Sequence, residues 1–229
     1  MCRLFSLTST DPVSPMKAIE ALEVMKEGHD GSGIGLFLTD LAGPFAEAKD
    51  LPILSGIFTT DGLARMKDFM SGQGFSPLHQ IVLRAKAAPP KGTPGRDVYL
   101  AQAFEPPPDW RDLPSKDLED RLTRTRLELR GMGQAEEDMV VFSFWPDVVM
   151  IKEVGDPMEI GEYLGLDRED LKARRIMAQG RQNTNYEINL YACHPFFIQG
   201  FSTMTNGENT AFVPIKEYLG AQGVPGYTG

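Results

Sequence analysis

Residues 29–40 read HDGSGIGLFLTD, a glycine-rich turn that runs into an apolar strand pattern. A dinucleotide-binding fingerprint needs a strand, then Gly-x-Gly-x-x-Gly, then a helix. Counting from Gly31 and Gly33, the third glycine position is occupied by Leu36, and a strand pattern follows. The order is therefore wrong for a nucleotide-binding fold. We expect these glycines to let the backbone pass close to another group, or simply to form a turn.

The segment before the glycines has the pattern of a helix. Ser14 is a suitable N-cap with Pro15 at the first helical position, and apolar residues recur at helical spacing from Met16 to Met25. Gly28 is a suitable residue to end the helix.

The remaining hydrophobic patterns come in blocks of strands and helices rather than in strict alternation. Strands are expected at 2–8, 34–39, 79–87, 139–145, 148–154, 174–180 and 200–204, and helices at 63–70, 115–130 and 156–166. The two strands that flank the Pro146–Asp147 pair are expected to form a hairpin. Such an arrangement favours an α+β fold with antiparallel pairing.

The stretch from about residue 89 to residue 137 differs from the rest, because it is rich in proline and charge. The helix expected at 115–130 should be exposed, since the stretch has too few apolar positions to close a core of its own. We interpret 89–137 as a surface insertion in a single domain that spans residues 1–229.

Composition excludes several functional classes. The chain has 229 residues, 41% hydrophobic residues and a formal net charge of −9, which argues against nucleic-acid binding as the main function, because phosphate contacts need a basic face. No apolar run approaches the roughly 20 residues of a membrane span, and the first residues lack the pattern of a signal peptide. We therefore expect a cytoplasmic protein with no membrane partner.

Thiols and imidazoles are scarce. Two cysteines, Cys2 and Cys193, cannot form a disulfide scaffold, a four-thiolate zinc site or an iron–sulfur cluster. The three histidines, at 29, 79 and 194, show no metal-ligand spacing, so we expect no metal site. Cys193 and His194 are adjacent, and neighbouring side chains of an extended chain point to opposite faces. Cys193 is therefore expected to be a buried thiol, and His194 a structural histidine.

Cys2 directly follows the start methionine. Removal of Met1 would leave a residue that carries a thiol and a free α-amine on the same carbon. An α-amine has a pKa of about 7.7–8.0 and can serve as a general base at neutral pH. A thiol with a pKa of about 8.5 needs only modest activation. Cys2 is thus the better nucleophile candidate of the two cysteines.

Two further motifs each have two interpretations. Asn206–Gly207 is a common type I′ hairpin turn, but an Asn side-chain amide followed by a glycine N–H can also stabilise an oxyanion. Arg181 lies in a segment rich in side-chain amides and hydroxyls. It would form either a surface salt bridge or a bidentate fork that holds a small carboxylate.

Together these segments resemble the class II glutamine amidotransferases, which are N-terminal-nucleophile hydrolases, and among them the amidotransferase domain of glutamate synthase and its stand-alone relatives. The segments that carry the resemblance are MCRLF at 1–5, DGSGIG at 30–35, GRQNTN at 180–185 and HPFFIQGFSTMTNGENTAF at 194–212. They occur in family order and cover the chain from its second residue to nearly its last, around the insertion.

The resemblance implies a four-layer αββα sandwich and a reaction in which the side-chain amide of glutamine is hydrolysed to glutamate and ammonia. Ammonia would pass to a synthase partner, and any flavin or iron–sulfur cluster would lie on that partner, because this chain carries no signature for a cofactor. The implied roles are nucleophile for Cys2, oxyanion donors for Asn206 and Gly207, and glutamine contacts for Arg181, Thr184 and Asn185.

The sequence departs from the family pattern at several positions. Gln179 and Thr205 stand where family members usually have histidine, and Gln182 stands where many have an aromatic residue. The family's acidic residue after the Asn-Gly motif, which binds the glutamine α-amine, is absent before the sequence ends at VPGYTG. Either the sequence is truncated, or another group or chain holds the amine. A catalytically impaired binding or regulatory subunit and an amidase with another substrate are the alternative functions.

Overall fold

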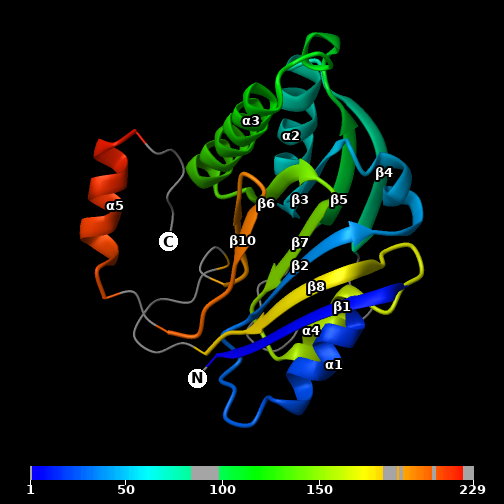
Figure 1. Ribbon diagram of the computed structural model, residues 1–229, viewed down its shortest axis with the longest axis vertical. Helices are drawn as coiled ribbons and strands as arrows, with labels where there is room; N and C mark the ends of the chain where they lie inside the picture. Colours follow the sequence, from blue (N-terminus) through cyan, green and yellow to red (C-terminus); the bar gives the residue numbers. More distant parts are fainter. Residues whose placement is uncertain (1, 84–97, 183–189, 191–192, 208–209, 224–229) are drawn as a thin grey trace.

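The computed structural model describes residues 2–83, 98–182, 190, 193–207 and 210–223 (Figure 1). Two four-stranded antiparallel sheets dominate the fold. The first has the order β1-β8-β2-β7, with β1 Arg3–Val13, β2 Ile34–Leu41, β7 Val148–Glu153 and β8 Ala173–Gly180. The second has the order β4-β5-β3-β6, with β3 Pro52–Phe58, β4 Ser76–Leu83, β5 Val98–Glu105 and β6 Met139–Pro146. The expected α+β class with antiparallel pairing is confirmed.

Helices and short elements complete the described chain. The α-helices are α1 Met16–Val24, α2 Thr60–Gly72, α3 Ser115–Glu136, α4 Pro157–Leu164 and α5 Phe212–Ala221, with 3-10 turns at Gly43–Ala48 and Pro108–Trp110. A two-stranded hairpin is formed by β9 Phe196–Ile198 and β10 Phe201–Thr203. No helix within the described ranges combines the length and apolarity that a membrane crossing requires.

Two apolar clusters hold these elements together. The larger one joins the two sheets and includes Leu36 and Ile151 from the first sheet and Ile53 and Ala101 from the second. The smaller one lies where α2 and α3 cover the second sheet, and contains Met66 and Leu129 among others. Figure 1 shows α1 and α4 together beside β1 and β8, away from α2 and α3. The two sheets therefore share one core, with helices packed against each.

The expected hairpin of 139–145 with 148–154 is wrong. β6 pairs with β3 and β7 pairs with β2, so these consecutive strands belong to different sheets. Asp147 lies between them with a positive φ of 53°. Its carboxylate accepts hydrogen bonds from the backbone N–H groups of Asp40 and Leu41, both at 2.8 Å. The turn thus leads the chain from one sheet to the other, and the carboxylate ties it to the end of β2.

The interpretation of 89–137 as a surface insertion does not hold for residues 98–137. β5 is an inner strand that pairs with both β3 and β4, and it is almost entirely buried. α3 buries Leu122 and Leu129 against the second sheet, and Trp110 is also buried. The proline and charge of the flanking turns obscured a strand that is central to the second sheet. Residues 89–97 lie outside the described part of the chain.

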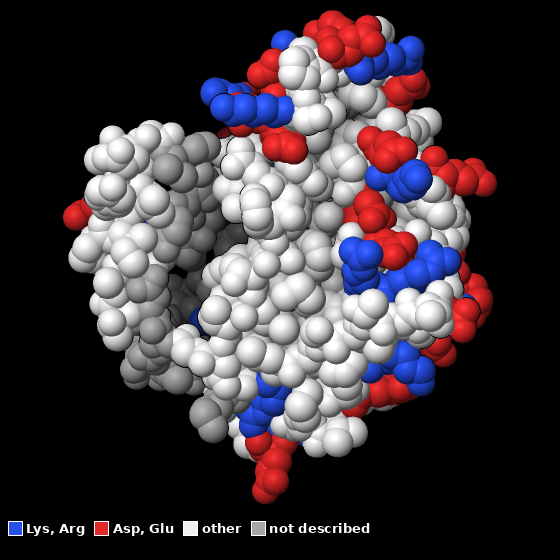
Figure 2. All heavy atoms as spheres, in the orientation of Figure 1, with Lys and Arg blue, Asp and Glu red and all other residues white. Residues whose placement is uncertain are grey.

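Charge is unevenly distributed over the surface. Figure 2 shows Lys, Arg, Asp and Glu along the top, the right-hand side and the bottom of the view, whereas the surface around α5 on the left is mostly uncharged. Phe201 on β10 and Val213 and Tyr218 on α5 are exposed there, and α5 buries no residue.

Candidate functional site

The pairing of β1 with β8 brings the start of the chain to the arginine segment. Arg3 pairs with Gly180 at the end of the first sheet, so Cys2, one residue before Arg3, lies beside the segment that follows Gly180. The backbone N–H of Gln182 contacts the Cys2 sulfur at 3.5 Å, and the thiol lies 3.9 Å from the Gln182 carbonyl oxygen. Cys2 is half-buried. The candidate nucleophile thus lies at one end of a well-paired sheet, 180 positions away in sequence from its neighbour.

Arg181 is buried at the same end of the sheet, with 8% of its surface exposed. Its backbone N–H donates to the Gly33 carbonyl at 2.8 Å, which fixes it to the glycine turn before β2. Burial raises the pKa of Cys193 and lowers the pKa of His194, and the positive charge of Arg181 opposes the first shift and adds to the second. The guanidinium is therefore close to the 193–194 segment, and the surface salt-bridge interpretation does not fit its burial.

The 193–195 segment lies directly on Gly35. A Cβ atom at Gly35 would lie 1.9 Å from the His194 carbonyl oxygen and 3.3 Å from Pro195 Cδ. Only a residue without a side chain can occupy this position of β2. The expected close approach of the backbone to another group occurs at Gly35, where that group is the backbone of His194.

Lys152 lies beneath this segment. It is buried on β7 opposite Gly35, and its ammonium donates to the Cys193 carbonyl. The ammonium also lies 5.1 Å from the centre of the Phe196 ring. Burial, together with the charges of Arg126, Arg130 and Arg181, lowers the pKa of Lys152 to about 7, against an opposing contribution from Cys193.

Cys193 is 2% exposed, as expected for a buried thiol. Burial raises its pKa to about 11, although the positive charges of Lys152 and Arg181 favour the thiolate. A thiol with such a pKa is almost wholly protonated at neutral pH, so Cys193 is a poor nucleophile.

Gln179 connects the arginine segment to both other motif segments. Its side-chain amide donates to the Thr205 carbonyl at 2.8 Å, and its amide oxygen accepts from the His194 backbone N–H at 3.0 Å. His194 Nδ1 lies 3.2 Å from the same oxygen, and His194 Nε2 lies 3.4 Å from the Thr205 hydroxyl. Burial lowers the pKa of His194 to about 4, so the ring is neutral at pH 7.

Asn206 and Gly207 follow this network and are exposed. The type I′ geometry expected at Asn206–Gly207 occurs instead at Gln199–Gly200, where both residues have positive φ and join β9 to β10. Residues 204–207 lie beyond β10 and outside any strand. The strand expected at 200–204 is thus the second arm of a short hairpin.

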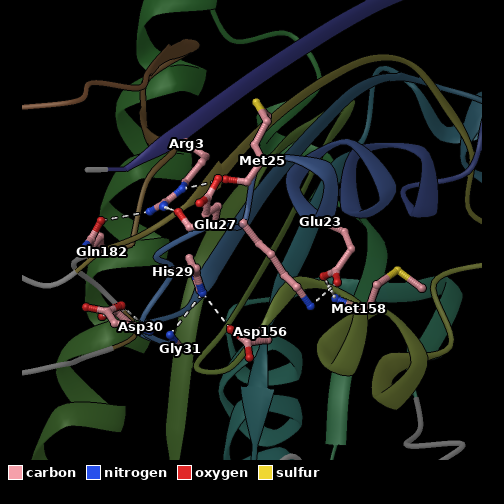
Figure 3. A network of polar contacts seen from close by, with 12 residues as sticks. Arg3, Glu23, Met25, Glu27, His29, Asp30, Gly31, Asp156, Met158 and Gln182 are labelled. Carbon is pink, nitrogen blue, oxygen red and sulfur yellow. Dashed lines mark hydrogen bonds and ion pairs between the residues drawn. The ribbon is translucent and has the colours of Figure 1, made fainter.

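A network of hydrogen bonds around the Arg3 guanidinium lies beside Cys2 and Gln182 (Figure 3). Arg3 Nε donates to the Met25 carbonyl at 2.9 Å, and Nη1 donates to the Gln182 side-chain oxygen at 3.0 Å. A further bond joins Nη2 to the Glu27 carbonyl. One guanidinium therefore ties the segment after α1 to the residue that contacts Cys2.

The glycine turn is also held from the side of α4. His29 Nδ1 lies 2.8 Å from an Asp156 carboxylate oxygen and 3.1 Å from the Gly31 backbone nitrogen (Figure 3). Asp156 precedes α4 as expected, but its side chain makes no cap bond and faces the histidine instead. The position of Gly33, whose carbonyl holds Arg181, is fixed through this turn.

The structure therefore gathers part of the predicted site. Cys2, Arg181 and the segment that leads to Asn206–Gly207 converge on the ends of β1, β2 and β8. Thr184 and Asn185 lie outside the described residues.

The contributions of two residues to this site escaped the sequence analysis. Lys152 interrupts the apolar run VVMIKEV, a signal that could have marked a buried cation. Gln179 was noted only as a departure from the family pattern, and its contacts gave no local signal because its partners are distant in sequence.

Comparisons with known proteins add no family. No protein-family model matches the chain, and no curated protein matches its sequence. Among the described residues, no group of three or more His, Cys, Asp or Glu side chains is arranged to hold a metal ion.

The depressed pKa of Lys152 predicts a pH-dependent stability. Between about pH 7 and its ordinary value of 10.5, Lys152 is mostly neutral in the folded chain and charged in the unfolded chain. The unfolded state then binds more protons, so stability increases with pH across this window. Relative to Lys152→Met, we expect the wild-type free energy of unfolding to rise from about pH 7 to about pH 9 and to level off below the folded pKa. Urea unfolding of both proteins at matched pH measures the difference, and a difference independent of pH would contradict the lowered pKa of Lys152.

Proposed function

We propose that this chain is a glutamine amidotransferase of the class II, N-terminal-nucleophile type. The observation that carries the proposal is the convergence of Cys2, the buried Arg181 and the segment before Asn206–Gly207 at one end of the first sheet. Two facing sheets with helices packed against each support the four-layer αββα arrangement that this type of enzyme would have. The whole of 1–229 would then be one amidotransferase domain.

The reaction would begin once Met1 is removed. The freed α-amine of Cys2 would take the thiol proton, directly or through a water, and the sulfur would attack the side-chain carbonyl of glutamine. Asn206 and Gly207 would donate to the oxyanion, each worth roughly 3–4 kcal/mol in the transition state. On collapse of the intermediate the α-ammonium would return the proton to the leaving nitrogen, so that ammonia departs and a thioester remains. Water would then hydrolyse the thioester to glutamate and restore the Cys2 thiol.

Positive charge near the nucleophile suits an amino-acid substrate. Arg181 would hold the α-carboxylate of glutamine, with Thr184 and Asn185 as further contacts. The uncharged surface near β10 and α5 is consistent with a site that opens onto a protein partner. That partner would be a glutamate-synthase-like subunit that receives ammonia and carries any flavin or iron–sulfur cluster, in the cytoplasm.

The direct test is an assay of the purified chain with glutamine. Glutamate and ammonia should appear in equal amounts, and asparagine and simple amides should give far less. Intact-mass measurement should show that Met1 is absent. A preparation that lacks Met1 and releases no ammonia from glutamine would contradict the proposal, and equal turnover of simple amides would favour a broader amidase.

Arg181→Ala is expected to raise KM for glutamine by about 100-fold, since a buried bidentate carboxylate contact would be lost. The value of kcat should change much less, because the contact is made before the chemical step as well as during it. Arg175→Ala is a matched control, because Arg175 is an exposed arginine on the same strand. Steady-state kinetics of both variants measure KM and kcat. An unchanged KM in Arg181→Ala would contradict the proposal that Arg181 binds the α-carboxylate of glutamine.

A further inference from the structure

Gln179 is the second-to-last residue of strand β8, just before the arginine segment, and its exposed fraction is 0%. Both ends of its side-chain amide are used. The nitrogen donates to the Thr205 carbonyl and the oxygen accepts from the His194 N–H. Because the two partners lie on separate segments, one side chain fixes both of them to the first sheet.

The bonds around Gln179 form a consistent closed set. A neutral His194 that carries its proton on Nδ1 can donate to the Gln179 oxygen, which leaves Nε2 free to accept from the Thr205 hydroxyl. Gln179, His194 and Thr205 then satisfy one another without any charged group. The segment that ends in Asn206–Gly207 is thereby tied to β8 one residue before the proposed oxyanion donors.

We infer that Gln179 is a positioning residue that sets Asn206 and Gly207 at the distance from Cys2 which oxyanion stabilisation requires. This inference rests on the proposed function. Asn206 and Gly207 are themselves exposed, so their placement depends on the bond to the preceding carbonyl. Oxyanion donors act only within a narrow range of distances, and a misplacement of about 1 Å can reduce the rate about 100-fold.

The same network explains two departures from the family pattern. Gln179 and Thr205 stand where that pattern has histidine, and the structure places them in contact with each other. The side chains of the two residues also meet through His194, since Nδ1 lies near the Gln179 oxygen and Nε2 lies near the Thr205 hydroxyl. Both positions thus have hydrogen-bond partners without a histidine at either of them.

The test compares Gln179→Ala with Gln102→Ala. Gln102 is also a buried glutamine on a strand, but on β5 of the second sheet, so it controls for a general loss of stability. Two rates are measured: turnover of glutamine, and alkylation of Cys2 by iodoacetamide, which needs the thiolate but no oxyanion donor. Gln179→Ala should lower kcat about 100-fold, leave KM within about threefold and leave the alkylation rate unchanged. Gln102→Ala should leave all three near wild-type values.

Gln179→Glu extends the test to a side chain of the same shape. An ionised carboxylate can accept from the His194 N–H but cannot donate to the Thr205 carbonyl, whereas a protonated one can do both. The ratio of the variant's kcat to the wild-type kcat should therefore rise as pH falls, which a purely structural role would not produce. This isosteric variant decides the question if Gln179→Ala does not fold.

The outcomes distinguish a failure of the inference from a failure of the proposed function. If the wild-type chain turns over glutamine and both Gln179 variants have the same kcat as wild type, only the positioning role is overturned. A parallel fall in turnover and alkylation, matched by Gln102→Ala, would reduce Gln179 to a structural residue and also overturn it. Absence of glutaminase activity in a wild-type chain that lacks Met1 would overturn the function and the inference together.

Discussion

Cys2→Ala is expected to lower ammonia release from glutamine to the level of the uncatalysed background, a loss of at least about 1,000-fold. The variant removes the only thiol that the structure leaves accessible at this end of the first sheet. Cys193 cannot replace it, because burial raises its pKa to about 11 and its carbonyl is held by Lys152. A colorimetric or coupled assay for ammonia, with glutamate measured in parallel, gives the rate.

Two controls separate the thiol from the amine. Cys2→Ser keeps the amine and a similar shape but supplies a much weaker nucleophile, so it should retain at most a small fraction of the activity. A preparation that retains Met1 keeps the thiol and hides the amine, and it should be nearly as inactive as Cys2→Ala. Turnover that persists in Cys2→Ala, or full activity in a chain whose intact mass includes Met1, would contradict the mechanism.

Local patterns predicted the elements of the fold better than their connections. The helical spacing from Met16 and the strand pattern after Gly33 correspond to α1 and β2, because α1 buries one apolar face and β2 is an apolar run that is buried on both faces for most of its length. The two strands around Asp147 were placed in one hairpin, although they pair in different sheets. A short turn between two strands normally indicates a hairpin, and the positive φ of Asp147 that redirects the chain leaves no clear sequence signal.

The error at 89–137 has a different physical cause. The run VYLAQAFE at 98–105 has the residues of a buried strand. Its flanks are rich in proline and charge, and averaging over the whole stretch hid eight residues that the second sheet needs. The same averaging suggested that α3 would be exposed, although Leu129 is completely buried. Composition describes a segment as a whole, whereas burial depends on which face of each element is apolar.

The candidate site was partly predictable because its residues carry chemistry that is unusual in their positions. A cysteine after the start methionine and an arginine among amides are visible in the sequence. The contribution of Gln179 was not, since it arises from hydrogen bonds to His194 and Thr205. Lys152 likewise gains its role from Cys193. Such contacts exist only after the strands have paired, and no window of the sequence contains both partners.

Gly35→Ala is expected to be the most damaging single-methyl change in the first sheet. The added Cβ would lie 1.9 Å from the His194 carbonyl oxygen and 2.8 Å from the carbonyl carbon. Backbone atoms cannot rotate away as the end of a flexible side chain can, so the 193–195 segment must lift from β2. Overpacking of this kind costs about 1–3 kcal/mol, and each buried polar group that loses its partner adds about 1–3 kcal/mol.

The groups at risk are those that the segment holds in place, namely the Cys193 carbonyl on Lys152 and the His194 N–H on Gln179. We therefore expect Gly35→Ala to lose several kcal/mol of unfolding free energy, and to lose glutamine turnover even under conditions where it remains folded. Gly131→Ala is the matched control, since nothing lies within 4 Å of a Cβ at this position of α3. There the same change should stabilise the chain by about 0.5–1 kcal/mol. Urea unfolding of both variants compares them directly, and a Gly35→Ala protein as stable as wild type would show that the 193–195 segment does not lie on β2.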